Sequence, residues 1–175
     1  MLPKLLPYMC YMFNTIPRTA SYPLQWKNAK VLALPKSANE FRLISILPFM
    51  SKVFESMLHE QISEFLCENN ILTLFQSGYM PGHNCVSALI KVSDDIRFEL
   101  DQNNVTFLTL LDHSKAFDTI NHQILCNKLI RFYKFSKQAV NLLNSYLCGR
   151  FQSVHINDKS LTFLPSIMVF LKAQY

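Results

Sequence analysis

The chain has 175 residues, half of them hydrophobic, which suits one domain with a sizeable buried core. Its 17 basic and 12 acidic residues give a net charge of +5, a mild excess that favours an anionic partner. Five widely spaced cysteines without a CxxC pair fit reduced thiols better than a disulfide framework, so we expect no disulfide partner.

The apolar N-terminal segment, residues 1–17, has only a superficial likeness to a signal peptide. Pro3, Pro7 and Asn14 interrupt it, and no small-residue cleavage site follows it. No segment of the sequence reaches the ~18 uncharged apolar residues that a membrane-spanning helix requires. We therefore expect an intracellular protein, in the cytoplasm or nucleus, that is not secreted and has no membrane partner.

The first half of the chain contains one strand pattern and two helix patterns. Val31 and Leu32 lie between polar ends in residues 28–35, which predicts a short strand. Apolar residues at helical spacing predict one helix from Val53 to Leu66 and another from Val86 to Leu100. No internal repeat and no flexible linker divides the sequence, so we expect a single domain.

A strand buried on both faces is predicted at residues 105–111, a largely apolar run rich in Val, Thr, Phe and Leu. Asp112 stands at the C-terminal end of this run, before a predicted helix whose first turn offers unpaired N–H groups. Mg²⁺ prefers oxygen ligands and takes one or two carboxylates together with substrate phosphates. Asp112 is therefore a candidate metal ligand, and the alternative is that its carboxylate only caps the helix.

The remaining elements complete a mixed pattern. A helix is predicted from Phe117 to Leu129, and Ser136 can cap a further helix that runs to a stop at Gly149. Residues 151–156 alternate like a strand, and residues 161–164 are its candidate hairpin partner. Strands and helices in this order predict an α+β fold.

Several sequence blocks carry a resemblance to a known family. Residues 110–122 read Leu-Leu-Asp-His-Ser-Lys-Ala-Phe-Asp-Thr-Ile-Asn-His and resemble the first palm motif of reverse transcriptases from non-LTR, LINE-like retrotransposons of the jockey or RTE type. Further blocks follow in the family's order and resemble its fingers, its RPISLLP block, its QxGFRxG loop and its SYLxxRxQxV segment: residues 26–36, 42–48, 76–82 and 145–154. Leu43 and Met80 depart from the pattern, where the family has proline and arginine. The resemblance spans roughly residues 3–165.

This resemblance implies the fingers and partial palm of a right-hand polymerase, with RNA-directed DNA polymerase activity by descent. The implied partners are an RNA template, a DNA primer and deoxynucleoside triphosphates, with Mg²⁺ as cofactor. Carried over position by position, Asp112 is the catalytic metal ligand and Phe117 is the aromatic residue beneath the incoming sugar. Lys36 and Arg42 resemble the family's residues that hold the triphosphate, where an arginine suits paired contacts and a lysine acts as a point charge. The alternative for both residues is an ordinary solvated surface charge.

Basic residues are the candidate nucleic-acid contacts. Lys27 and Lys30 belong to the fingers block and are assigned to nucleic-acid binding by the resemblance. Lys128, Arg131 and Lys134 recur every three residues, which is compatible with a basic stripe along a helix facing the nucleic-acid backbone. The alternative for these three residues is an ordinary solvated face.

The family continues with a GVPQGS block and a YxDD turn, and neither occurs in this sequence. One synonymous codon choice for the last ten residues encodes Gly-Val-Pro-Gln-Gly-Ser in another phase. We therefore expect a truncated reverse transcriptase domain at residues 1–165 and an out-of-frame tail at 166–175. The YxDD turn supplies further metal-binding carboxylates, so we expect an inactive fragment. The alternative function is a non-catalytic remnant that binds nucleic acid or another protein.

Overall fold

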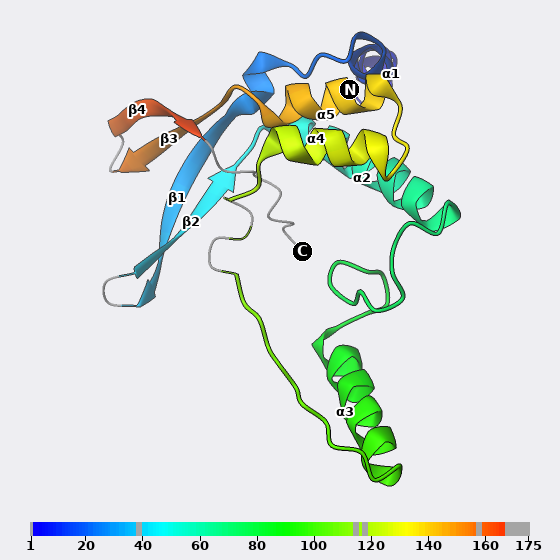
Figure 1. Ribbon diagram of the computed structural model, residues 1–175. Helices are drawn as coiled ribbons and strands as arrows, with labels where there is room; N and C mark the ends of the chain where they lie inside the picture. Colours follow the sequence, from blue (N-terminus) through cyan, green and yellow to red (C-terminus); the bar gives the residue numbers. More distant parts are fainter. Residues whose placement is uncertain (1, 38–39, 114–115, 117–118, 157–158, 167–175) are drawn as a thin grey trace. The chain divides into compact units, whose positions relative to one another are not determined.

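The structure, a computed structural model, describes residues 2–37, 40–113, 116, 119–156 and 159–166 (Figure 1). The chain divides into two compact units. The first comprises Met1–Glu60 and Lys115–Tyr175, and the second comprises Gln61–Ser114. Strands and helices occur together in the first unit, which agrees with the mixed α and β composition expected from the sequence.

A four-stranded mixed sheet forms part of the first unit. Its strands are β1 (Asn28–Ser37), β2 (Glu40–Ile46), β3 (Arg150–Ile156) and β4 (Lys159–Ser166), in the order β2-β1-β3-β4. Each outer pair is antiparallel, whereas β1 and β3 are parallel neighbours. The predicted strand at 28–35 and the predicted hairpin after residue 151 are confirmed. Strand β2 was not predicted from periodicity.

The first unit also contains helices, which lie in the sequence before β1 and between β2 and β3. They are α1 (Leu2–Thr19), the short 3-10 helix η1 (Leu24–Lys27), α2 (Phe49–Glu68, whose last turns belong to the second unit), α4 (His122–Arg131) and α5 (Lys137–Leu147). Ser136 caps α5 as predicted, because its side chain accepts a hydrogen bond from the amide of Ala139. The helix ends before Gly149, whose φ of +66° suits glycine.

Helix α4 begins later than predicted. Asn121 is its N-cap and accepts a hydrogen bond from the amide of Ile124, so the helix starts at His122. Thr119 lies in a turn and Ile120 has no regular structure. The predicted start at Phe117 lies outside the described residues.

Aromatic packing holds the first unit together. Its core joins α1, η1, α2 and α5 through eight buried side chains: Phe13, Ile16, Tyr22, Trp26, Phe54, Leu142, Tyr146 and Leu147. The rings of Tyr22 and Tyr146 meet edge to face, with centroids 5.0 Å apart at 88°. Such edge-to-face pairs are favoured by the ring quadrupoles beyond the area they bury. Tyr22 is therefore central to the contact between the N-terminal segment and α5.

The second unit contains the predicted helix α3 (Cys85–Asp101) but not the predicted strand. Asn84 and Ser87 form a reciprocal capping box at the start of α3. Lys91 holds the preceding loop to this helix, because its Nζ donates to the carbonyl of Leu74 and lies 4.6 Å above the Phe75 ring. None of the residues of α3 is buried.

The strand predicted at residues 105–111 is wrong in this structure. Residues 104–113 have no regular secondary structure and all are exposed, with Phe107 at 90 % exposure. A strand is stable only when a neighbour satisfies its backbone N–H and C=O groups. Within the described residues no strand pairs with this segment. The apolar composition of residues 105–111 favours burial, but these residues are exposed in this structure.

Candidate functional site

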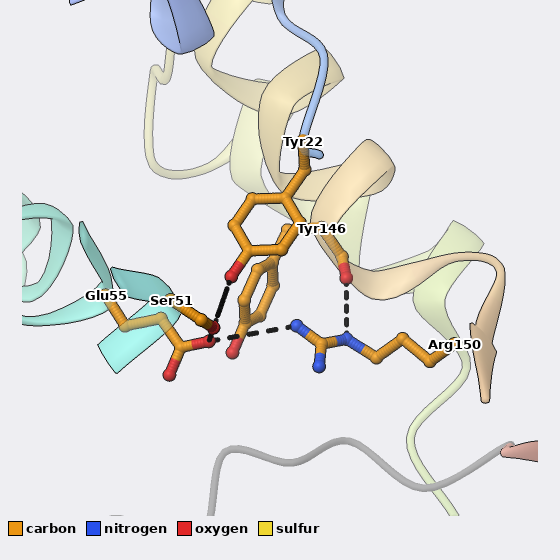
Figure 2. A network of polar contacts seen from close by, with 5 residues as sticks. All are labelled: Tyr22, Ser51, Glu55, Tyr146 and Arg150. Atoms are coloured by element: carbon orange, nitrogen blue, oxygen red, sulfur yellow. Dashed lines mark hydrogen bonds and ion pairs between the residues drawn. The ribbon is translucent and has the colours of Figure 1, made fainter. Parts of the chain in front are cut away.

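A buried polar cluster lies inside the first unit (Figure 2). The hydroxyl of Tyr22 is 2.8 Å from Oγ of Ser51 and 3.2 Å from Oε1 of Glu55. Ser51 also donates to Glu55 over 3.0 Å. The three side chains come from the loop after α1 and from the first turns of α2. They form a closed set of hydrogen bonds around one carboxylate.

Arg150, the first residue of β3, completes this cluster. Its Nε donates to the carbonyl of Tyr146 over 2.7 Å, and its Nη2 lies 3.9 Å from Oε1 of Glu55 (Figure 2). Its guanidinium carbon lies 4.1 Å from the centroid of the Tyr146 ring. A buried guanidinium requires such compensation because leaving water is costly for a charge. We name Tyr22, Ser51, Glu55, Tyr146 and Arg150 the arginine cluster.

Burial changes the protonation behaviour of several groups near the arginine cluster. Desolvation, with a smaller contribution from the charge of Glu55, holds the pKa of both Tyr22 and Tyr146 well above the usual range for tyrosine. Both phenols therefore stay protonated. Burial, and then the charge of Arg150, lowers the pKa of Lys27. These groups are suited to holding the fold rather than to proton transfer at neutral pH.

Asp112, the predicted metal ligand, is exposed in the second unit. Its side chain makes no hydrogen bond or ion pair with the residues that the structure describes. It does not cap α4, because Asn121 does. Within the described ranges no three residues among histidine, cysteine, aspartate and glutamate gather in a way that could hold a metal ion. Asp112 thus offers one solvent-facing carboxylate, which fits one ligand position of Mg²⁺ but not a complete protein site.

The two predicted triphosphate-binding residues belong to adjacent strands. Arg42 of β2 pairs with Leu34 of β1, and Lys36 lies in the irregular stretch of β1 between Pro35 and Ser37. The backbone therefore carries both residues to the same end of the β1–β2 hairpin. Phe117, the predicted aromatic residue beneath the sugar, lies outside the described residues.

The basic residues differ in accessibility. Lys30 is exposed, whereas Lys27 is 6 % exposed, which leaves little of its side chain for a nucleic-acid backbone. Lys128 and Arg131 are exposed in the last turn of α4, where cations also favour the helix dipole. Lys134 is exposed as well, but α4 ends at Arg131 and Lys134 has a φ of +57°, so the predicted helical stripe does not extend to it.

The arginine cluster was not found from the sequence. Arg150 stands in one of the family blocks quoted above, but the block gave it no role, and Glu55 lies outside those blocks. The available signal was a single arginine between apolar residues at the start of a predicted strand. Sequence alone does not distinguish a buried arginine from an exposed one, because the distinction depends on contacts between distant segments.

Among the helices that the structure describes, none combines the length and the hydropathy of a membrane span. All five cysteines are free thiols.

Comparison with known proteins agrees with the resemblance seen in the sequence. Residues 34–167 match the family described as Reverse transcriptase (RNA-dependent DNA polymerase). The chain is 27 % identical over 157 residues to the probable RNA-directed DNA polymerase from transposon BS of Drosophila melanogaster, and 31 % identical over 149 residues to that from transposon X-element. It is 22 % identical over 166 residues to the RNA-directed DNA polymerase from mobile element jockey.

These alignments cover 86 %, 82 % and 91 % of this chain but only 17 %, 16 % and 18 % of the respective relatives. The chain thus spans less than a fifth of the length of the curated relatives it matches. The family match, in contrast, covers most of the chain. The chain belongs to the reverse transcriptase (RNA-dependent DNA polymerase) family, and its relatives are polymerases of jockey-like mobile elements.

Proposed function

We propose that this chain is the fingers and first palm segment of a retrotransposon RNA-directed DNA polymerase. The observation that carries the proposal is the family match over residues 34–167, which includes the motif around Asp112. Asp112 is exposed, so its carboxylate is accessible to a ligand. The substrates of the complete enzyme would be deoxynucleoside triphosphates on an RNA template with a DNA primer.

The residues of this chain would divide the work of nucleotide binding. Asp112 would provide one carboxylate ligand for Mg²⁺, which when bound neutralises the charge of the phosphates during phosphoryl transfer. Lys36 and Arg42 would hold the triphosphate from one end of the β1–β2 hairpin. Phe117 would lie beneath the sugar and disfavour a ribose 2′-hydroxyl.

The arginine cluster connects β3 to the helices of the first unit. Arg150 starts β3, and β3 lies parallel to β1 from the pair Asn28 and Phe151 to the pair Val31 and Val154. Glu55 and the Tyr146 carbonyl hold Arg150 to α2 and α5. The N-terminal end of β1 is therefore held near the helical core through its pairing with β3. Lys36 lies on the same strand.

We infer that the chain by itself does not polymerise DNA. The sequence contains neither the GVPQGS block nor the YxDD turn, so the further carboxylates of a two-metal site are absent from it. We also propose that residues 166–175 are read out of frame. The family match ends at residue 167, two positions into the proposed tail. Sequencing the locus tests it, since DNA beyond codon 166 without GVPQGS and YxDD in another phase would exclude it.

Primer extension with an RNA template, a DNA primer and Mg²⁺ tests the activity of the chain as it stands. The expected result is no extension, together with binding of the primer and template that weakens as salt rises. Extension by this chain would contradict the proposed inactivity. Such extension persisting in Asp112→Asn would also exclude Asp112 as the metal ligand.

A second candidate function is nucleic-acid binding without chemistry. The observation that favours it is the set of exposed cations in the first unit, formed by Lys30, Lys128, Arg131 and Lys134. This function predicts binding with similar affinity to RNA and DNA of different sequences, because contacts to phosphates carry no sequence information. Failure to bind either polymer at low salt would exclude it.

A further inference from the structure

Two of the five thiols approach the same amide oxygen. Cys126 belongs to α4, and Cys148 is the residue that follows the last turn of α5. The thiol of Cys148 donates to Oδ1 of Asn144 over 3.4 Å, and that of Cys126 lies 4.0 Å from the same oxygen. The two sulfur atoms can therefore be no farther apart than these two distances together.

The two thiols differ in accessibility. Cys148 is exposed, whereas Cys126 is 6 % exposed. Burial, with an added contribution from the charge of Cys148, raises the pKa of the Cys126 thiol. An oxidant in solution would thus meet Cys148 first, because reactivity requires access as well as thiolate.

We propose that Cys126 and Cys148 are a redox-modification site that closes an intramolecular disulfide when the protein meets a peroxide. Asn144 holds both sulfur atoms near each other in the reduced protein. The proposal is independent of the polymerase function. The disulfide would be a reversible modification that forms only in the presence of an oxidant, because the cysteines are otherwise free thiols.

The chemistry proceeds in two balanced steps. The thiolate of Cys148 attacks one oxygen of hydrogen peroxide, the O–O bond breaks, and the products are a sulfenic acid and hydroxide. The thiolate of Cys126 then attacks the sulfenic sulfur, the S–S bond forms, and the S–O bond breaks with loss of a second hydroxide. The two thiol protons convert both hydroxides to water. Two thiols are thereby oxidised by two electrons, which the peroxide accepts.

The disulfide would connect two elements at the edge of the arginine cluster. Cys148 is separated from Arg150 only by Gly149, and α4 and α5 are packed helices joined by a short connection. The bond would fix the C-terminal end of α5, and with it the start of β3, to the middle of α4. Oxidation would therefore form a cross-link close to the junction between α5 and β3.

Peptide mapping of the full chain tests the proposal. The reduced protein is treated with one equivalent of hydrogen peroxide, the remaining thiols are alkylated, and the trypsin digest is analysed by mass spectrometry. Trypsin cuts after Lys128, Arg131, Lys134 and Lys137, so the peptides that contain the two cysteines are separated unless a disulfide joins them. The expected result is one cross-linked pair within the monomer, containing Cys126 and Cys148, that is lost on reduction.

Variants make this result specific. Cys148→Ser changes an exposed side chain, and it should leave Cys126 fully alkylated after peroxide treatment. The triple variant Cys10→Ser, Cys67→Ser and Cys85→Ser should still form the cross-link with unchanged yield. The proposal is overturned if Cys148 stays as a trapped sulfenic acid while Cys126 remains reduced. It is equally overturned if either cysteine pairs with Cys10, Cys67 or Cys85, or with another molecule, as readily as with its proposed partner.

Discussion

Arg150 lies with Nη2 3.9 Å from Oε1 of Glu55, and the side chain of the arginine is 1 % exposed whereas that of the glutamate is 25 % exposed. The carboxylate can therefore keep contact with water while it compensates the buried guanidinium. Segments that are far apart in the sequence meet at this pair, because Glu55 belongs to α2 and Arg150 begins β3. The stability of the first unit should depend on it.

Removing the arginine tests this dependence. Arg150→Ala should lower the free energy of unfolding by about 3 kcal/mol, because the contact with Glu55 and the packing on the Tyr146 ring are both lost. Arg150→Lys should recover only part of it, since an ammonium cannot reproduce the planar hydrogen bonds and ring contact of a guanidinium. Urea unfolding measures both variants. A loss below about 0.5 kcal/mol for Arg150→Ala, as for an ordinary surface substitution, would contradict the role of the cluster.

The buried tyrosines predict a loss of stability at high pH. Tyr22 and Tyr146 have folded-state pKa values above the unfolded value near 10.0, so they are protonated in the folded state when they already ionise in the unfolded chain. Their contribution is complete below pH 10 and falls as pH rises above it. The loss is up to about 1.4 kcal/mol per pH unit for each tyrosine. Unfolding of the double variant Tyr22→Phe, Tyr146→Phe should show a shallower decline.

Lys27 gives the opposite dependence of stability on pH, and its effect lies at pH values below 10.5. Burial lowers its folded-state pKa below the usual lysine value of 10.5, so its contribution to stability increases as pH rises toward 10.5. The variant Lys27→Met removes this contribution and serves as the matched background for the tyrosine measurement. If the decline above pH 10 has the same slope with and without the two phenols in that background, their raised pKa values are not the cause.

The helix caps give a local test of the first unit. Asn121→Ala and Ser136→Ala each remove an oxygen that accepts a backbone amide at the start of α4 or α5. Each change should lower the free energy of unfolding by about 1 kcal/mol. Replacement by aspartate at either position should cost less, because a carboxylate also accepts this hydrogen bond. Chemical denaturation followed by circular dichroism makes the comparison, and an alanine variant as stable as the parent would show that the cap is not formed.

Much of the helical structure could be predicted from the sequence, because apolar residues at helical spacing and cap residues indicate the same segments. Apolar residues at helical spacing from Val53 to Leu66 predicted α2, and Ser136 marked the start of α5. Helix α1 was missed because Pro7 and Pro17 lie inside it, and a proline removes a backbone donor from the helix. Its buried face, with Phe13 and Ile16, offsets that loss. The run at 105–111 was assigned to a strand because its composition favours one, but pairing depends on a partner strand that no local pattern specifies.

Less of the candidate site than of the fold could be predicted from the sequence. Motif order identified Asp112, Lys36 and Arg42, but it gave no geometry that joins them. The order of the motifs could not predict the arginine cluster, because its residues come from segments that are far apart in the sequence. Burial also separated two lysines that the sequence treated alike, since Lys27 is buried and Lys30 is exposed.

The exposed cations near α4 predict a measurable salt dependence of nucleic-acid binding. The triple variant Lys128→Gln, Arg131→Gln, Lys134→Gln should weaken binding to RNA and DNA alike and reduce the slope of log K against log salt by about one unit for each lost phosphate contact. Lys137→Gln is the matched control, because this lysine is also exposed but begins α5 and lies outside the predicted stripe. Fluorescence anisotropy at several salt concentrations makes the measurement. Equal slopes for the parent and the triple variant would place the nucleic-acid contacts elsewhere.

The most direct measurement of the central claim is primer extension by a protein in which the reading frame beyond codon 166 continues into the GVPQGS and YxDD segments. Asp112→Asn should reduce Mg²⁺-dependent extension by at least about a hundredfold, because it removes one charged ligand from the metal site. Asp94→Asn, which changes an exposed carboxylate of α3, should leave extension unchanged. Extension that is equal in the parent and in Asp112→Asn would contradict the account.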